Sequence, residues 1–244
     1  RATQPVSPSV LVLAPTRELA VQIQEEALKF GRASGIRSMV AHGGGMQLRN
    51  KQIKQLRTLR PNMMVCTPGR CNDFIEDGLI DLSNVKYLVL DEADRMLDMG
   101  FQPQIESIIE STPENRQTSL FSATWPREVR GLAADYLKDP VQLQVGNGEL
   151  TANKAIVQSV KIVRNERDKN DALIELLTEL DPERLEGRNA DGLPKMIIFR
   201  ARKHSCDGLV QMLKECGIRS DSLHGDKSQS ARNAILDKFR KGHT

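Results

Sequence analysis

Five short apolar segments, each followed at once by polar residues, glycine or proline, constrain the fold of the first half of this chain more than any other feature. We expect them to be strands, and they are Val10–Ala14, Ile36–Ala41, Met63–Cys66, Tyr87–Leu90 and Thr118–Phe121. Helical patterns at Arg17–Phe30 and Gln47–Leu59 lie between them. Strands that are apolar on both faces and alternate with helices predict a parallel sheet covered on both sides. In such sheets ligands bind beyond the carboxyl ends of the strands, which is where the polar clusters fall here.

A second α/β region is predicted after Gly146 and Gly148, which interrupt the periodic pattern. The expected strands of this region are Ile156–Val163, Met196–Phe199 and Ser220–Leu223, its expected helices are Lys169–Leu180, Lys203–Cys216 and Ser228–Arg240, and Asp181–Pro194 is expected to be a surface loop. We therefore predict an α/β protein with domains at 1–145 and 156–244 and a linker at 146–155.

Composition narrows the class of protein. No apolar run reaches the length of a membrane span, so no membrane partner is expected. None of the four cysteines belongs to a Cys-x-x-Cys pair, which argues against a zinc site. The stretch from Ala27 to Asn72 contains no acidic residue and nine basic ones. Such a stretch can lie along a phosphate backbone, although a solvated helix face is the common alternative.

Acidic residues follow the fourth expected strand, in the order Asp91, Glu92, Ala93 and Asp94. In nucleotide hydrolases with a phosphate loop, an Asp at this position helps to hold the Mg²⁺ that bridges the phosphates. A neighbouring Glu can orient or deprotonate the attacking water. The alternative is a polar turn that starts a helix, because acids favour the positive end of the helix dipole.

The other strand-end clusters each allow an ordinary reading as a helix cap or a tight turn. They are Pro15-Thr16-Arg17, Gly43-Gly44, Thr67-Pro68-Gly69-Arg70 and Ser122-Ala123-Thr124. Together with Asp91–Asp94, and in this order and spacing, they resemble the motifs of the DEAD-box ATP-dependent RNA helicases over essentially the whole chain. The resemblance implies two RecA-like domains with parallel sheets covered by helices, both incomplete in this chain.

The resemblance also implies roles for residues near the acids. Asp91 would hold Mg²⁺, through water, and Glu92 would serve the hydrolytic water of a bound ATP. Asp94, Ser122 and Thr124 would form the hydrogen-bonded link between nucleotide state and domain closure. The implied cofactors are ATP and Mg²⁺.

The implied partner is RNA, contacted through its backbone and therefore without sequence preference, by a protein that we expect to be a monomer. In the first half the implied contacts are Pro15, Thr16, Arg17, Gly43, Gly44, Thr67, Pro68, Gly69 and Arg70. In the second half they are Phe199, His224, Gly225, Gln229 and Arg232.

The sequence contains no G-x-x-x-x-G-K-[ST] phosphate loop. We therefore expect a fragment of a helicase that separates short RNA duplexes with ATP, and expect no turnover from the fragment alone. Trp125-Pro126 resembles a largely nuclear eukaryotic branch, so a nuclear or cytoplasmic location is expected. Two alternatives remain: a helicase-derived RNA-binding or scaffold protein without turnover, and a DNA translocase, against which the Asp-Glu-Ala-Asp and Ser-Ala-Thr motifs argue.

Overall fold

The computed structural model describes residues 4–145, 155–180 and 195–243. The chain divides into two compact units, Arg1–Gly148 and Glu149–Thr244. The predicted linker at 146–155, apart from its last residue, and the predicted loop at 181–194 lie outside the described residues. Within the described ranges, no helix is both long enough and apolar enough to cross a membrane.

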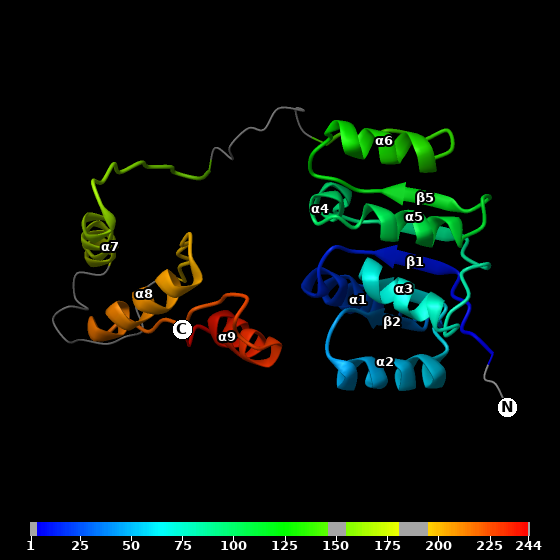
Figure 1. Ribbon diagram of the computed structural model, residues 1–244, viewed down its shortest axis with the longest axis horizontal. Helices are drawn as coiled ribbons and strands as arrows, with labels where there is room; N and C mark the ends of the chain where they lie inside the picture. The colour runs from blue at the N-terminus through cyan, green and yellow to red at the C-terminus, as the bar shows by residue number, and fades with distance from the viewer. Residues whose placement is uncertain (1–3, 146–154, 181–194, 244) are drawn as a thin grey trace. The chain divides into compact units, whose positions relative to one another are not determined.

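The first unit contains a parallel sheet of five strands (Figure 1). The strands are β1 (Val10–Leu13), β2 (Ser38–Ala41), β3 (Met63–Cys66), β4 (Tyr87–Leu90) and β5 (Gln117–Leu120). Their order is β2-β3-β1-β4-β5, so β1 lies at the centre and pairs in register with β3 and β4. The predicted parallel sheet is confirmed. The second strand begins two residues later than predicted, because the backbone N–H of Arg37 donates to Oδ1 of Asn62 instead of to a neighbouring strand (2.9 Å).

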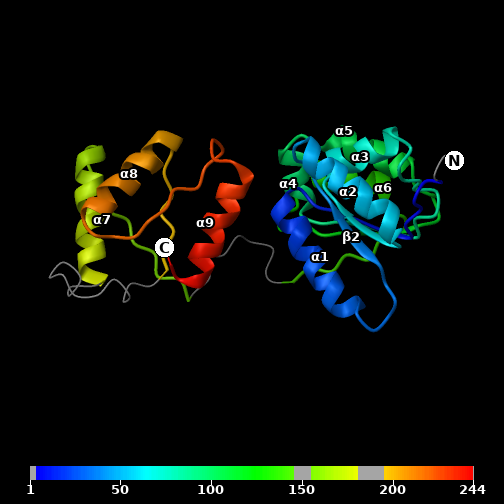
Figure 2. The ribbon, with the colours of Figure 1, turned by 90° about the horizontal axis from the view of Figure 1, so that it is seen from below.

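Six helices among the described residues of the first unit cover the two faces of this sheet (Figures 1 and 2). They are α1 (Arg17–Gly31), α2 (Met46–Leu59), α3 (Pro68–Glu76), α4 (Ala93–Asp98), α5 (Gln102–Glu110) and α6 (Arg127–Tyr136). Helix α3 starts at Pro68, in a cluster for which the sequence allowed either a helix cap or a tight turn. Proline suits the first position of a helix, because its missing N–H would have no partner there and its φ is already helical.

The core follows the two-residue period of the strands. On β1, Leu11 and Leu13 face a large cluster that includes Phe74 of α3 and Ile105 of α5. Val12 faces the opposite cluster, with Ala20 of α1. Both faces of β1 are therefore covered by packed side chains, which explains the continuous apolar run of this central strand.

The second unit has three helices among its described residues: α7 (Glu166–Leu180), α8 (Lys203–Glu215) and α9 (Gln229–Lys241). Leu177 of α7 packs against Leu209 and Leu213 of α8 and forms a small core. The helices were predicted to within a few residues of these bounds.

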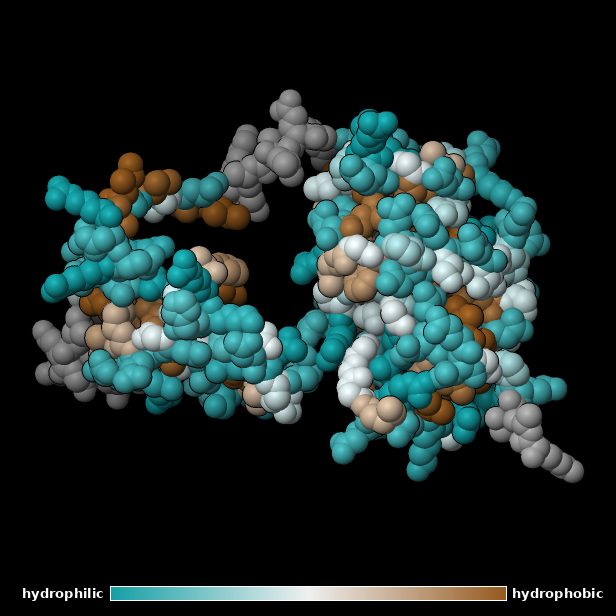
Figure 3. Space-filling view, in the orientation of Figure 1, coloured by the Kyte–Doolittle hydropathy of each residue, from teal (hydrophilic) through white to brown (hydrophobic). Residues whose placement is uncertain are grey.

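Three strand predictions in the second unit, at Ile156–Val163, Met196–Phe199 and Ser220–Leu223, are wrong. None of these segments forms a strand in the described structure. Apolar side chains stand exposed on the segment before α7 (Figure 3), where Val157 is 96% and Val160 91% exposed. The physical reason is that a helix makes its backbone hydrogen bonds internally, whereas a strand forms only with neighbouring strands to pair with.

Candidate functional site

The five predicted motif clusters of the first unit follow the carboxyl ends of the five strands and so share one edge of the sheet. Backbone hydrogen bonds continue past the strand ends and fix the starts of the loops. The N–H of Asp91 donates to the carbonyl of Leu13, and the N–H of Thr67 donates to the carbonyl of Ala41, both at 3.0 Å. The loops after neighbouring strands are therefore aligned along this edge.

Glu92 has a backbone conformation that is unusual for a residue with a side chain. Its φ of 50° and ψ of 53° are left-handed, and it is the N-cap of α4. Its N–H donates to Oδ1 of Asp91 (3.0 Å), and the N–H of Ala93 donates to the carbonyl of Phe121 after β5 (3.0 Å). A left-handed residue that is not glycine costs about 1–3 kcal/mol and is held by its surroundings, often at functional sites. The turn places Asp91 and a half-exposed Glu92 side chain at the sheet edge.

Asp94 joins this turn to the segment after β5. Its Oδ2 accepts hydrogen bonds from the hydroxyl of Thr124 (2.7 Å) and from the N–H of Thr124 (3.0 Å). The hydroxyl of Ser122 donates to the carbonyl of Thr124 (2.7 Å). Burial acts to raise the pKa of Asp94, but hydrogen bonding by Thr124 and Ser122 outweighs it and lowers the pKa below its ordinary value. The three residues that were predicted to act together are in contact.

The segment Pro15-Thr16-Arg17 follows β1 and leads into α1. Thr16 is the N-cap, and its hydroxyl accepts a hydrogen bond from the N–H of Leu19 (3.3 Å). The guanidinium of Arg17 lies beside Gly43, since a Cβ added to that glycine would be 3.8 Å from an Nη atom of Arg17. The clusters after β1 and β2 are therefore neighbours in space. Their positions in the sequence do not show this.

Arg70, which the resemblance implied to contact RNA, is buried in the structure. The residue is only 5% exposed, and its guanidinium is engaged within the protein. Nε donates to Asp73 (3.1 Å), Nη1 to Oε1 of Gln52 (2.5 Å) and Nη2 to the carbonyl of Gly44 (3.3 Å). Its Cζ also lies 5.7 Å from the centre of the Phe74 ring. These contacts tie the guanidinium to α2 and to the loop that precedes it.

Thr67, Pro68 and Gly69 form the start of α3, beside Arg70. Thr67 is the N-cap of this helix and is buried. A Cβ added to Gly69 would meet no heavy atom within 4 Å, so this glycine lies against open space. An approaching chain can therefore come close to the backbone at Gly69.

In the second unit, His224 is held by an acidic residue that the sequence analysis did not select. Nε2 of His224 lies 3.1 Å from the carboxylate of Asp207 on α8, and the hydroxyl of Ser222 donates to the same carboxylate (2.5 Å). The Ser222 hydroxyl first, and then His224, lower the pKa of Asp207 to about 2. Nδ1 of His224 is buried without a hydrogen-bond partner.

The remaining predicted residues of the second unit are not gathered as tightly. Phe199 is 89% exposed. Gly225 lies beside the side chain of Lys203, which pairs with Asp226 (2.6 Å). Gln229 and Arg232 lie on the first turn of α9, where Gln229 donates to Asn233 (3.0 Å).

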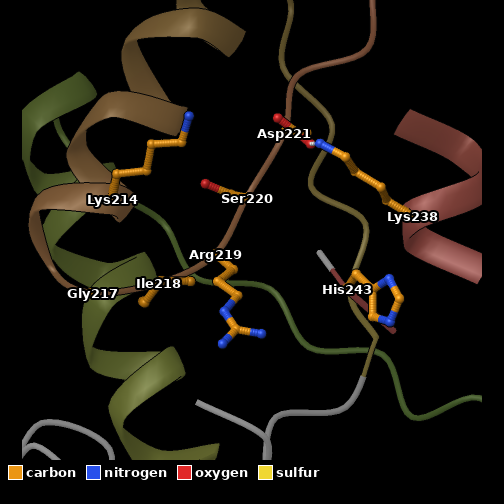
Figure 4. A pocket seen from close by; sticks show the side chains of 8 residues that line it. All are labelled: Lys214, Gly217, Ile218, Arg219, Ser220, Asp221, Lys238 and His243. Carbon is orange, nitrogen blue, oxygen red and sulfur yellow. Dashed lines mark ion pairs between the residues drawn. The ribbon is translucent and has the colours of Figure 1, made fainter. Parts of the chain in front are cut away.

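A pocket of about 450 Å³ in the second unit lies away from these residues (Figure 4). Lys214, Gly217, Ile218, Arg219, Ser220, Asp221, Lys238 and His243 line it. Lys238 pairs with Asp221 across it at 3.6 Å. None of the predicted site residues contributes to this pocket.

Sequence reasoning missed Gln52 and Asp207, which position predicted residues. Gln52 is 10 residues from His42 and 18 residues from Arg70, so no local pattern marks these contacts. Asp207 lies 17 residues before His224. Asp73, by contrast, stands three residues after Arg70 on the same helix, a spacing that suggests an ion pair.

Comparison with known proteins gives two family matches. Residues 2–132 match the model described as DEAD/DEAH box helicase, and residues 168–244 match the helicase conserved C-terminal domain. The first match alone covers more than half of the chain.

Curated relatives agree with these matches. The ATP-dependent RNA helicase DBP2 of Vanderwaltozyma polyspora is 46% identical over 237 residues, which cover 97% of this chain and 51% of the relative. DBP2 of Saccharomyces cerevisiae (strain S288c) is also 46% identical, over 97% of this chain and 41% of the relative. The chain thus spans about half the length of the curated relatives it matches, or less.

A solved structure agrees as well. The crystal structure of a DEAD box protein from the hyperthermophile Methanococcus jannaschii superposes with a TM-score of 0.53 and 31% sequence identity. The superposition covers 96% of this chain and 59% of that one. It confirms the RecA-like fold class that the sequence predicted.

Proposed function

This chain belongs to the DEAD/DEAH box helicase family, and on that premise we propose that it is part of an ATP-dependent RNA helicase. Residues 1–145 and 156–244 are its two helicase domains, and 146–155 join them. The separation of the two family matches, at 2–132 and 168–244, supports this division. The protein works in the nucleus or the cytoplasm, where its RNA substrates occur.

One observation carries the proposal: the Asp91-Glu92 turn and the Asp94–Thr124 link lie together at the sheet edge. The link joins the segments that follow β4 and β5 through the hydrogen bonds of 2.7 and 3.0 Å on Asp94. An acidic turn that is mechanically tied to the next strand can transmit a change at the nucleotide to the rest of the domain. A polar turn that only starts a helix would not need this connection.

Magnesium fits this edge. The described residues contain no cluster of three or more His, Cys, Asp or Glu side chains that could hold a metal by themselves. Mg²⁺ in nucleotide sites is commonly bound through one or two carboxylates together with phosphates and water. Asp91 is the carboxylate that would hold it, through water. Bound Mg²⁺ and ATP would supply the phosphoryl group and neutralise the charge that develops on it.

Glu92 is the residue that orients the attacking water and accepts its proton. The left-handed backbone fixes the direction in which its side chain leaves the chain. Oε2 of Glu92 forms a long ion pair with Nη1 of Arg95, at 3.9 Å. Asp94, Ser122 and Thr124 then connect this centre to β5.

RNA lies along the part of the edge formed by the loops after β2, β3 and β1. Thr16, Arg17, Gly43, Gly44, Thr67, Pro68 and Gly69 contact its sugar-phosphate backbone, with Pro15 shaping the turn. Glycines permit close approach, and hydroxyl, amide and guanidinium groups donate to phosphate oxygens. In the second domain, the proposed RNA contacts are Phe199, His224, Gly225, Gln229 and Arg232.

An ATPase measurement on the full-length protein tests the proposal. We expect ATP hydrolysis that single-stranded RNA stimulates and that Glu92→Gln abolishes. RNA binding without turnover would instead establish the scaffold alternative. Equal stimulation by DNA of the same sequence would favour a DNA translocase, because only the 2′-hydroxyl distinguishes the two backbones.

A further inference from the structure

A buried polar cluster lies beneath the loop that connects β2 to α2. Gln52 of α2 and Arg70 of α3 are 4% and 5% exposed, and they contact each other through Oε1 and Nη1 (2.5 Å). Burying a guanidinium and an amide is costly unless their hydrogen bonds are made. Gln52 and Arg70 make hydrogen bonds to backbone carbonyls of this loop. The cluster therefore stabilises the conformation of the loop.

The chemistry of arginine fixes the orientation of the glutamine. A guanidinium can only donate hydrogen bonds, so the amide of Gln52 must turn its oxygen to Arg70. Its Nε2 then points the other way and donates to the carbonyl of His42 (3.2 Å). Arg70 itself donates to the carbonyl of Gly44 (3.3 Å), and Asp73 holds its Nε (3.1 Å). The carbonyls of His42 and Gly44, two residues apart in the loop, therefore both point toward the buried cluster.

Planar peptide groups convert these inward carbonyls into outward donors. In a trans peptide the carbonyl oxygen and the following N–H point in opposite directions, and the described residues contain no cis peptide. With the carbonyls of His42 and Gly44 turned toward the cluster, the N–H groups of Gly43 and Gly45 point away from it. Gly45 is the N-cap of α2, whose first turn contains no acidic residue, so the helix adds favourable potential for an anion at the same place.

We propose that Gln52 and Arg70 are positioning residues for RNA binding: they hold the loop 42–45 so that the N–H groups of Gly43 and Gly45 donate to an RNA phosphate beside Arg17. This inference rests on the proposed function, since it assigns a phosphate to that loop. It also explains why a charged residue that was predicted to contact RNA is buried. Arg70 contributes to RNA binding through the loop, and its own charge does not reach the phosphate.

The test measures single-stranded RNA binding by the full-length protein at several salt concentrations, beside thermal unfolding. Gln52→Leu removes the amide that orients the loop. Gln24→Leu is the matched control, because Gln24 is also buried and donates to a backbone carbonyl, that of Ser38 (2.9 Å), at the start of β2 and so at the opposite end of that strand from the loop. Both variants lose a buried hydrogen bond and should lower the melting temperature.

We expect Gln52→Leu to weaken RNA binding about tenfold or more, the equivalent of one hydrogen bond to a charged group, and Gln24→Leu to bind as wild type. The salt dependence of Gln52→Leu should equal that of wild type, because amide N–H groups release no counterions. Equal RNA affinity of folded Gln52→Leu and Gln24→Leu would overturn the inference.

A second variant keeps the test decisive if Gln52→Leu does not fold. Gln52→Glu retains an acceptor for Arg70 but cannot donate to the carbonyl of His42. Its folded form should also bind RNA more weakly, and wild-type affinity would overturn the inference. Failure of the proposed function looks different: wild type itself would not bind RNA, or Arg17→Ala would bind as tightly as wild type.

Discussion

The carboxylate of Asp94 accepts two hydrogen bonds from one residue, Thr124, through its hydroxyl at 2.7 Å and its backbone N–H at 3.0 Å. The two residues are 30 positions apart in sequence and belong to the segments that follow β4 and β5. The pair therefore acts as a connection between two loops at the edge of the sheet.

Replacing Thr124 by Val should weaken this connection while keeping the shape of the side chain. The hydroxyl bond is lost and the backbone N–H bond remains, so the free energy of unfolding of the first unit should fall by about 1 kcal/mol. Denaturant unfolding measures this change. In the full-length protein, we also expect RNA to stimulate ATP hydrolysis less strongly in this variant. Unchanged RNA stimulation, despite lower stability, would remove Thr124 from the link.

The stabilising effect of the Asp94–Thr124 pair should depend on pH. Hydrogen bonding lowers the pKa of Asp94 in the folded protein, so the native state favours the charged carboxylate. Its contribution is present in full above the ordinary aspartate pKa, declines as the pH falls through that value, and is gone below the folded pKa. The stability difference between wild type and Thr124→Val should therefore be larger at pH 7 than at pH 3. A constant difference would contradict this assignment.

Glu92→Gln should leave ATP binding intact and slow hydrolysis on the order of 10²–10⁴-fold, because the amide keeps the shape but cannot accept a proton. Single-turnover hydrolysis by the full-length protein, with nucleotide binding measured separately, distinguishes the two effects. Asp98→Asn, at the other end of α4, is the control and should behave as wild type. A rate within a few-fold of wild type would exclude Glu92 as the base.

Arg17 and Arg70 should respond differently to replacement by Ala. Arg17→Ala should flatten the log–log salt dependence of RNA binding by about 0.7, the loss of one phosphate contact on a single strand. Arg70→Ala should leave that slope unchanged. It should lower the free energy of unfolding by about 2 kcal/mol, because Oε1 of Gln52 and the carbonyl oxygen of Gly44 lose their hydrogen-bond donor. Titration at several salt concentrations and a melting curve separate the two. A flattened slope in Arg70→Ala would return Arg70 to direct phosphate contact.

The sequence predicted what local patterns determine. The central strand and the cluster Pro15-Thr16-Arg17 after it were recognisable. A strand that is buried on both faces consists of apolar residues, so the first polar residues mark its end. The burial of Arg70 was not recognisable, since its partner Gln52 comes from another helix and meets it only through tertiary packing.

The strand predictions in the second unit failed for a related reason. A sequence such as Met196–Phe199 has the composition of a strand, but composition cannot supply the neighbour that a strand requires. The helices of the same unit were predicted well, because the period of their apolar residues is a property of the segment itself.

The strand order also fixes the spacing of the loops along this edge of the sheet. Neighbouring strands lie about 4.8 Å apart, so the loops after β2, β3 and β1 cover roughly 10 Å, and the acidic turn after β4 begins about one strand spacing beyond them. Lengthening a loop would change its reach but not this interval, because backbone pairing fixes it. The proposed RNA-binding loops and the acidic turn can therefore change in sequence without losing their alignment at β1.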